Sequence, residues 1–244
     1  MEKLKTKKLL YGCFVFFTLF VFQVFAGKIG SFTAALTSYE LVDPYNIYAM
    51  VSVHHFVQMI FTLVVIVVLN KLLKVNFNFN LGDRKTGMKY LTVYTGVFIL
   101  AAFILHALMY INNRLPVYEF PLNKNNIAGT LGFQLLLSGP SEEILFRALP
   151  VTVLTYVLGK SVKVKKHITL EVILASILFS IAHIKWSLEP FTVQADCFQL
   201  VYAFVLGTIQ GVAYQKSRSI LYPILMHSFS NVIMVGTGYL FALL

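Results

Sequence analysis

Long apolar stretches alternate with short polar segments along the whole chain. Seven of these stretches approach the roughly 20 residues that a helix needs to cross a bilayer. They run Leu9–Ala26, Val51–Leu73, Tyr90–Ile111, Ile127–Leu158, Ile168–Ile184, Cys197–Tyr214 and Ser219–Leu244. Helices are the expected form, because lipid offers no hydrogen-bond partners to an open strand edge. The pattern predicts an all-α membrane protein with about seven transmembrane helices.

The composition supports a membrane protein and a single membrane domain. Of the 244 residues, 58% are hydrophobic and 12% are charged, whereas soluble domains average about 25% charged residues. The linkers are short and polar, with no internal repeat and no low-complexity tract. We expect residues 1–126 to form three spans and residues 127–244 to form a helical core of four spans.

The net charge of +10 is distributed unevenly over the predicted loops. Alternate loops hold 15 of the lysines and arginines, against 4 in the intervening loops: Lys3, Lys5, Lys7, Lys8, Lys71, Lys74, Arg84, Lys85, Lys89, Lys160, Lys163, Lys165, Lys166, Lys216 and Arg218, against Lys28, Arg114, Lys124 and Lys185. This asymmetry is typical of the positive-inside rule and predicts a cytoplasmic N-terminus and an outside C-terminus. Topology and contact with the lipid bilayer therefore account for the basic charge, and we expect no nucleic-acid partner.

Two interpretations of the first apolar stretch stay open. Basic residues followed by an apolar run that ends at Val24-Phe25-Ala26 are compatible with a cleaved signal peptide. The run is longer than the usual apolar region of such a peptide, which favours a retained helix. Cys13 and Cys197 are too few for a disulfide framework or a metal cluster, and we assign them no role.

Two adjacent acids lie inside the stretch Ile127–Leu158. A carboxylate at membrane depth costs on the order of 2.5–3.5 kcal/mol, so Glu142 and Glu143, with the intramembrane Arg147, indicate a functional site. The alternative is that Ser138–Ser141 starts a helix and leaves the acids in an ordinary first turn. The apolar runs on either side are each too short to span alone, which favours one long or proline-kinked helix.

Helical spacing gives the two acids different environments. Glu143 and Arg147 are four residues apart and share a face, so they can form an ion pair. Glu142 points about 100° away, and we expect it to have no such partner. We expect this free carboxylate to serve as general base and acid.

Two histidines have polar or aromatic neighbours at helical spacing. His183 shares a face with Phe179, and His227 shares a face with Asn231. A lone histidine in an apolar helix more often packs than reacts, and we interpret His54, His55 and His106 in that way.

Glu-Glu-x-x-x-Arg at 142–147, Phe-x-x-x-His at 179–183 and His-x-x-x-Asn at 227–231, in this order, resemble the signature motifs of the CPBP (CAAX protease and bacteriocin-processing) family of intramembrane proteases. The resemblance covers roughly residues 127–235. It implies that Glu142 activates a water that His183 helps to orient, and that His227 and Asn231 bind the oxyanion. It also implies that Glu143 and Arg147 hold the site together.

The resemblance implies hydrolysis of a membrane-associated peptide or protein. No cofactor is firmly implied; Glu142, His183 and His227 could hold a divalent metal such as zinc, but the absence of a zincin motif favours a metal-free water. Short loops and the Asn-, Lys-, Ile- and Phe-rich composition suggest a bacterial cytoplasmic membrane, where peptide pheromone or bacteriocin maturation and self-immunity are candidate settings. A non-catalytic immunity or carrier protein that retains the motifs stays open as the alternative.

Overall fold

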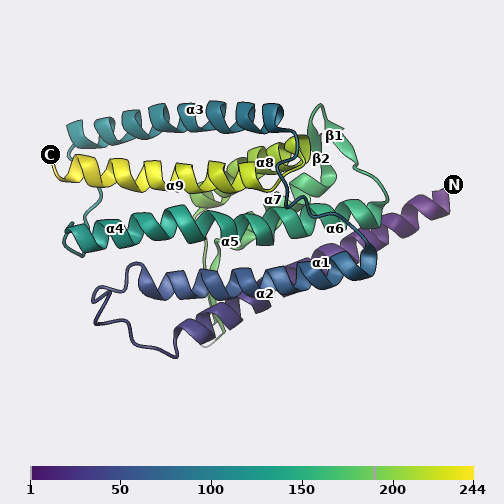
Figure 1. The fold of residues 1–244 in the computed structure, drawn as a ribbon, viewed down its shortest axis with the longest axis horizontal. Helices are drawn as coiled ribbons and strands as arrows, with labels where there is room; N and C mark the ends of the chain where they lie inside the picture. Colours follow the sequence, from purple (N-terminus) through teal and green to yellow (C-terminus); the bar gives the residue numbers. More distant parts are fainter. Residues whose placement is uncertain (1, 189–190) are drawn as a thin grey trace.

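The computed structural model describes residues 2–188 and 191–244 as an all-α protein, as predicted (Figure 1). In these ranges the chain forms seven helical segments and two small β-hairpins. The helical segments are α1 (Glu2–Ala34), α2 (Ala49–Leu73), α3 (Arg84–Ile111), a broken helix, α7 (Leu170–Ile181), α8 (Cys197–Ser217) and α9 (Leu221–Ala242). The broken helix comprises α4 (Lys124–Phe133), the π-helical turn η1 (Gln134–Ser138), α5 (Gly139–Glu143), the π-helical turn η2 (Ile144–Ala148) and α6 (Leu149–Leu158).

The hairpins flank α7 and shorten it relative to the prediction. β1 (Lys163–Lys165) pairs antiparallel with β2 (Ile168–Thr169), and β3 (Lys185–Leu188) pairs antiparallel with β4 (Phe191–Gln194). We predicted a span over 168–184, but α7 has 12 residues, which is about 18 Å at the helical rise of 1.5 Å per residue. Residues at both ends of the apolar stretch are therefore in turns and strands rather than in the helix.

Five helices within the described residues are long and apolar enough to cross a membrane: Leu10–Ala34 of α1, α2, α3, α8 and α9. The most apolar 18-residue windows of α2 and α3 have mean hydropathies of 2.3 and 2.1, yet only 17% and 28% of the residues in them are buried. Their apolar side chains, such as Val97 and Phe103 of α3, therefore lie on the outside of the bundle. An outer surface of this kind requires lipid around it, so the protein is an integral membrane protein.

Two prolines explain the breaks in the central helix. A proline has no N–H, and its ring clashes with the carbonyl four residues earlier, which loosens the helix at that point. Pro140 follows η1 and Pro150 follows η2, so each widened turn contains the carbonyl that its proline displaces. The backbone of Ser138 is helical (φ −57°, ψ −59°), so the chain passes through Gly139-Pro140 as one continuous helical path. The structure therefore excludes a helix start in a loop and supports the predicted kinked helix.

The α2–α3 connection is fastened to the turn between α8 and α9. Asp83 N donates to Ser217 O at 2.6 Å, and Gly82, at φ 50°, has no room for a side chain against Ser217 O. Asp83 also caps α3, and the hydrogen bond from the Thr86 side chain lowers the pKa of this exposed carboxyl below its usual value. The connection thus holds the starts of α3 and α9 beside each other.

Apart from the α7–α8 connection, the connections gather at two opposite ends of the molecule (Figure 1). The N-terminus, the α2–α3 connection, the β1–β2 hairpin and the α8–α9 turn lie toward one end, on the right of Figure 1. The C-terminus and the α1–α2 and α3–α4 connections lie toward the other end. We call the first of these ends the basic end, because 15 of the 20 lysines and arginines fall in or beside these segments.

Candidate active site

The two adjacent acids lie in α5, at the middle of the broken helix, and their side chains have different surroundings. The side chain of Glu143 is fully buried, whereas that of Glu142 keeps 19% of its surface exposed and lines a cavity. Successive residues of a helix point in directions about 100° apart, which separates the two carboxylates.

Glu143 is the centre of a buried charge network. Its Oε1 accepts a hydrogen bond from His227 Nδ1 at 2.7 Å and lies 3.2 Å from Arg147 Nη1, so the structure contains the predicted ion pair. Arg147 Nη2 donates to Gln210 Oε1 at 2.6 Å, and its guanidinium carbon lies 4.0 Å from the centre of the Phe179 ring. A buried charge needs compensating partners of this kind, and here they come from α7, α8 and α9. The network therefore ties four helical segments together behind the cavity.

Glu142 faces two histidines across the cavity. Its Oε2 lies 3.8 Å from His227 Nε2, and its Oε1 lies 4.0 Å from His55 Nδ1. The expectation that Glu142 has no partner was wrong, because it considered only residues on its own helix, whereas these partners come from α9 and α2. Separations of this size exceed a hydrogen bond and leave room for a bridging water.

His183 lies just beyond the C-terminal end of α7. Its Nδ1 is 2.9 Å from the carbonyl oxygen of Phe179, and the two rings meet edge to face with their centres 4.8 Å apart. The Phe179 ring centre is also 6.0 Å from that of His227. Phe179 thus separates the two histidines and helps to fix both rings.

Asn231 lies one helical turn beyond His227 on α9. Its Nδ2 donates to Gln134 Oε1 at 2.9 Å and to Ser138 Oγ at 3.0 Å, both in the widened turn η1. The amide is therefore oriented by α4–α5 before any ligand arrives.

The cavity has a volume of about 420 Å³, and predicted site residues from α5, α7, the turn after α7 and α9 line it. They are Glu142, Phe179, His183, His227 and Asn231, while Glu143 and Arg147 lie behind them. A carboxylate, imidazoles and an amide around one cavity supply a base and hydrogen-bond donors, as hydrolysis of a carbonyl compound requires.

A comparison with known protein families gives a match over this part of the chain. The profile of the Rce1-like type II CAAX prenyl endopeptidases matches residues 124–233, from the start of α4 into α9. Residues 124–233 belong to this family. Since its members are endopeptidases, the chain carries a protease domain with a protein substrate. Comparisons with curated proteins and with solved structures gave no match.

Val51 and His55 line the cavity from outside the Rce1-like domain, and the polar one of the two is His55. It is on α2, its ring centre is 5.1 Å from that of Phe133, and its buried Nδ1 has no hydrogen-bond partner among the described residues. We interpreted it as a packing residue because a lone histidine in an apolar helix more often packs than reacts. Its actual environment depends on how α2 meets α5, which the sequence does not show. The sequence did hold a signal: His54, His55 and Gln58 form a polar group in an apolar stretch, and Gln58 Oε1 accepts from Ser141 Oγ at 3.2 Å.

The residues that the sequence proposed for a metal do not form a ready ligand set. Within the described parts of the chain, no three His, Cys, Asp or Glu side chains come close enough together to hold a metal ion. Nδ1 of His183 faces Phe179 O, and Nδ1 of His227 is engaged by Glu143. Hydrogen bonds at Nδ1 leave Nε2 of both rings free, so it is the spacing of Glu142, His183 and His227 that does not fit a metal in this arrangement, and the reaction proposed below uses no metal in any step.

Proposed function

We propose that this chain is an intramembrane endopeptidase that hydrolyses a peptide bond in a membrane-associated peptide or protein through a water activated by Glu142. The observation that carries the proposal is that Glu142 Oε2 and His227 Nε2 face each other at 3.8 Å across a cavity of about 420 Å³. A water in the cavity, to one side of the line that joins these two atoms, would contact both groups.

The chemical step needs one base and one returned proton. Glu142 takes a proton from the water, and the oxygen forms a bond to the carbonyl carbon of the scissile peptide while the carbonyl π electrons move to its oxygen. When the carbon–nitrogen bond breaks, the same carboxyl group gives the proton to the leaving nitrogen. A positioned general acid and base typically contributes 10²–10⁴-fold to the rate, on the order of several kcal/mol.

His227 and Asn231 are the proposed donors to the oxyanion. Because Nδ1 of His227 is held by Glu143, the free Nε2 faces the cavity, and in the doubly protonated ring it donates to the oxyanion. Asn231 Nδ2 donates now to Gln134 and Ser138, and the oxyanion would replace one of these acceptors. Donors placed in advance at developing charge often give the largest part of catalysis. His183 is the proposed group that orients the water or the substrate carbonyl.

The arrangement of the helices also supports a specific topology. The chain direction alternates from each helical segment to the next in Figure 1. Together with the basic end, this supports seven crossings with a cytoplasmic N-terminus and an outside C-terminus. We propose a bacterial cytoplasmic membrane as the location, with peptide pheromone or bacteriocin maturation, or self-immunity, as the setting.

The proposal is tested by mapping new peptide N-termini in membranes of cells that produce the wild type, Glu142→Gln or His227→Ala. Glu119→Gln is the matched control, because Glu119 is an exposed acid in the α3–α4 connection. We expect products that are present with the wild type and with Glu119→Gln, and that form about 10²–10⁴-fold more slowly with the two site variants.

Membrane levels of all four proteins must be equal in this experiment. If Glu142→Gln and His227→Ala formed the same products at the wild-type rate, the proposed mechanism would be rejected. If no product depended on the protein at all, a non-catalytic role would replace the proposal.

A further inference from the structure

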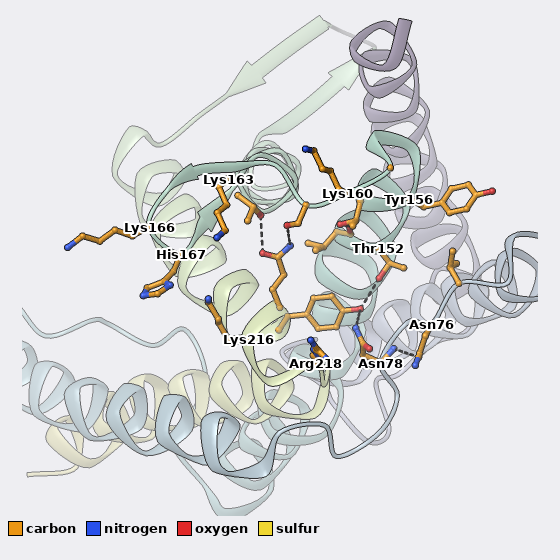
Figure 2. Close-up of a pocket in the computed structure, with 18 residues that line it drawn as sticks. Asn76, Asn78, Thr152, Tyr156, Lys160, Lys163, Lys166, His167, Lys216 and Arg218 are labelled. Carbon is orange, nitrogen blue, oxygen red and sulfur yellow. Dashed lines mark hydrogen bonds between the residues drawn. The ribbon is translucent and has the colours of Figure 1, made fainter. Parts of the chain in front are cut away.

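A second and larger cavity opens at the basic end of the molecule (Figure 2). Its volume is about 850 Å³, and the end of α6, the β1–β2 hairpin, the end of α8 and residues 75–78 form its walls. It shares no lining residue with the cavity around Glu142. The proposed peptidase mechanism therefore does not use it.

The charged side chains that line this cavity are all basic. The basic residues are Lys160, Lys163, Lys166, His167, Lys216 and Arg218, and the lining contains no acidic residue. In the described part of the chain, none of these six takes part in an ion pair. The side chains of Lys163 and Lys216 extend toward one another in Figure 2, whereas Lys166 points away from them. Like charges held around one hollow repel each other and attract an anion.

The neighbouring acid, Glu171, forms no ion pair with any of these basic residues in the described part of the chain. Glu171 is fully buried, and it accepts hydrogen bonds from Ser161 Oγ, from Gln215 Nε2 at 2.8 Å and from Val162 N at 3.3 Å. Its carboxylate oxygens therefore bond to uncharged groups of the cavity wall and not to the lysines. The floor is also polar and fixed: Tyr214 Oη lies 2.8 Å from Thr152 Oγ1 and donates to Phe77 O at 3.1 Å.

Two of the basic residues occupy backbone conformations that do not favour them. Lys166 has φ 39° and Arg218 has φ 53°, a left-handed region in which glycine or asparagine is more stable. Such conformations persist mainly where the surrounding structure requires them and often occur at functional sites. At both positions the chain carries a cation that lines the cavity.

We infer that this cavity binds a phosphate group. The guanidinium of Arg218 and the ammonium groups of Lys163 and Lys216 provide charge-assisted donors that phosphate oxygens accept. The cavity is larger than a bare phosphate ion. The bound phosphate can therefore be part of a larger molecule, with a polar substituent in contact with Tyr214 and Thr152.

Two sources share this chemistry: the headgroup of an anionic phospholipid and a soluble phosphate compound. The exposed Val164 lies in β1 between Lys163 and Lys165, so the hairpin combines apolar and basic side chains as a membrane surface would require. The proposal does not depend on the proposed peptidase function.

The test uses the full chain in nanodiscs of phosphatidylcholine, titrated with inorganic phosphate at constant ionic strength, with the thermal unfolding midpoint as the signal. The variant is Lys163→Gln/Lys216→Gln. The matched control, Lys124→Gln/Lys185→Gln, removes the same charge from exposed lysines that do not line the cavity. We expect phosphate to stabilise the wild type and the control alike, and the variant to need about tenfold more phosphate, or more, for each lysine lost.

A second set of nanodiscs contains phosphatidylglycerol in addition. If this lipid stabilises the wild type and removes the response to phosphate, a lipid headgroup occupies the cavity; if phosphate still stabilises, the ligand is a soluble phosphate compound. The inference is overturned if the cavity variant titrates like the control. It is also overturned if chloride acts as phosphate does, or if neither probe stabilises the wild type.

Discussion

His227 lies between two carboxylates, and each of its ring nitrogens faces a different one. Glu143 holds Nδ1 at 2.7 Å, and Glu142 lies 3.8 Å from Nε2. A hydrogen bond to one nitrogen fixes the tautomer and the ring orientation, which decides what the other nitrogen can do. Glu143, held in turn by Arg147, therefore positions the ring, and Glu142 is the acid that has access to the cavity.

Replacing His55 with alanine should slow peptide cleavage while leaving substrate affinity nearly unchanged. His55 Nδ1 lies 4.0 Å from Glu142 Oε1, so in the proposed mechanism it helps to position the carboxylate that activates the water. We expect kcat to fall about tenfold, the size of one charge-assisted contact, with little change in KM. We also expect an altered pH dependence of kcat, measured on the purified protein with an identified substrate.

His106→Ala is the matched control for this change. His106 is also a buried histidine, but its Nδ1 lies 2.9 Å from Ala102 O of its own helix, and no residue of α3 lines the cavity. It should lower the unfolding temperature without altering the pH dependence of kcat. A His55→Ala enzyme with unchanged kcat and an unchanged pH profile would contradict the positioning role.

At the scale of single residues, the sequence predicted contacts within one helix and missed contacts between helices. Glu143 and Arg147 are four residues apart, so helical spacing alone placed their charges side by side. The approach of His55 to Glu142 joins residues 87 positions apart and depends on how α2 meets α5. Spacing along the chain carries no information about such a contact until the helix packing is known.

At the scale of helices, the site depends on how closely α5 approaches α9. A Cβ at Gly139 would lie 2.3 Å from Ser228 Oγ and 3.0 Å from both Ile224 O and Ser228 N. Two of these three atoms belong to the backbone of α9, which cannot move as a side chain can. Small residues at such crossings let membrane helices approach each other closely. Gly139 therefore sets the distance between the helix that carries Glu142 and the helix that carries His227.

Gly139→Ala should separate these helices and lower both stability and activity. We expect a loss of about 1–3 kcal/mol in the free energy of unfolding, typical of overpacking, measured by denaturation in detergent. Gly132→Ala is the matched control, because a Cβ there meets nothing within 4 Å. Adding Ser228→Gly to Gly139→Ala should restore part of the loss by removing the Ser228 Oγ contact. Equal stability of Gly139→Ala and Gly132→Ala would show that the α5–α9 approach is not tight.

The kinks and ends of the helices were predictable where residues within the helix itself determine them. Pro140 and the apolar runs beside it predicted one kinked helix, and the structure has one. The shortening of α7 was not predictable in this way, because Ile168 and Ile184 are as apolar as the helix between them. Strand pairing at Lys163–Lys165 and Lys185–Leu188 ends the helix there, and pairing depends on partners outside the apolar stretch.

At the scale of the whole molecule, the Rce1-like domain and the helices before it form the cavity together. The Rce1-like match begins at residue 124, yet α2 supplies His55 to the cavity, and Gln58 accepts a hydrogen bond from Ser141. The segment before residue 124 therefore contributes to the candidate site as well as to the membrane-spanning bundle. Family comparison alone could not have assigned that part of the site, because the match does not extend to α2.

The two ends of the molecule should lie on opposite sides of the membrane, and exposed positions allow this to be measured. In a background of Cys13→Ser and Cys197→Ser, we would introduce Leu41→Cys or Val117→Cys, which lie in the α1–α2 and α3–α4 connections and are 102% and 92% exposed. Val164→Cys in the β1–β2 hairpin represents the basic end. Lysine and arginine are retained in the cytoplasm during insertion, so a membrane-impermeant thiol reagent should label Leu41→Cys and Val117→Cys in intact cells. Val164→Cys should react only after the cells are permeabilised.

The reverse labelling pattern would invert the topology and place the basic cavity outside. Labelling of all three cysteines in intact cells would contradict a membrane-spanning bundle with two separate ends.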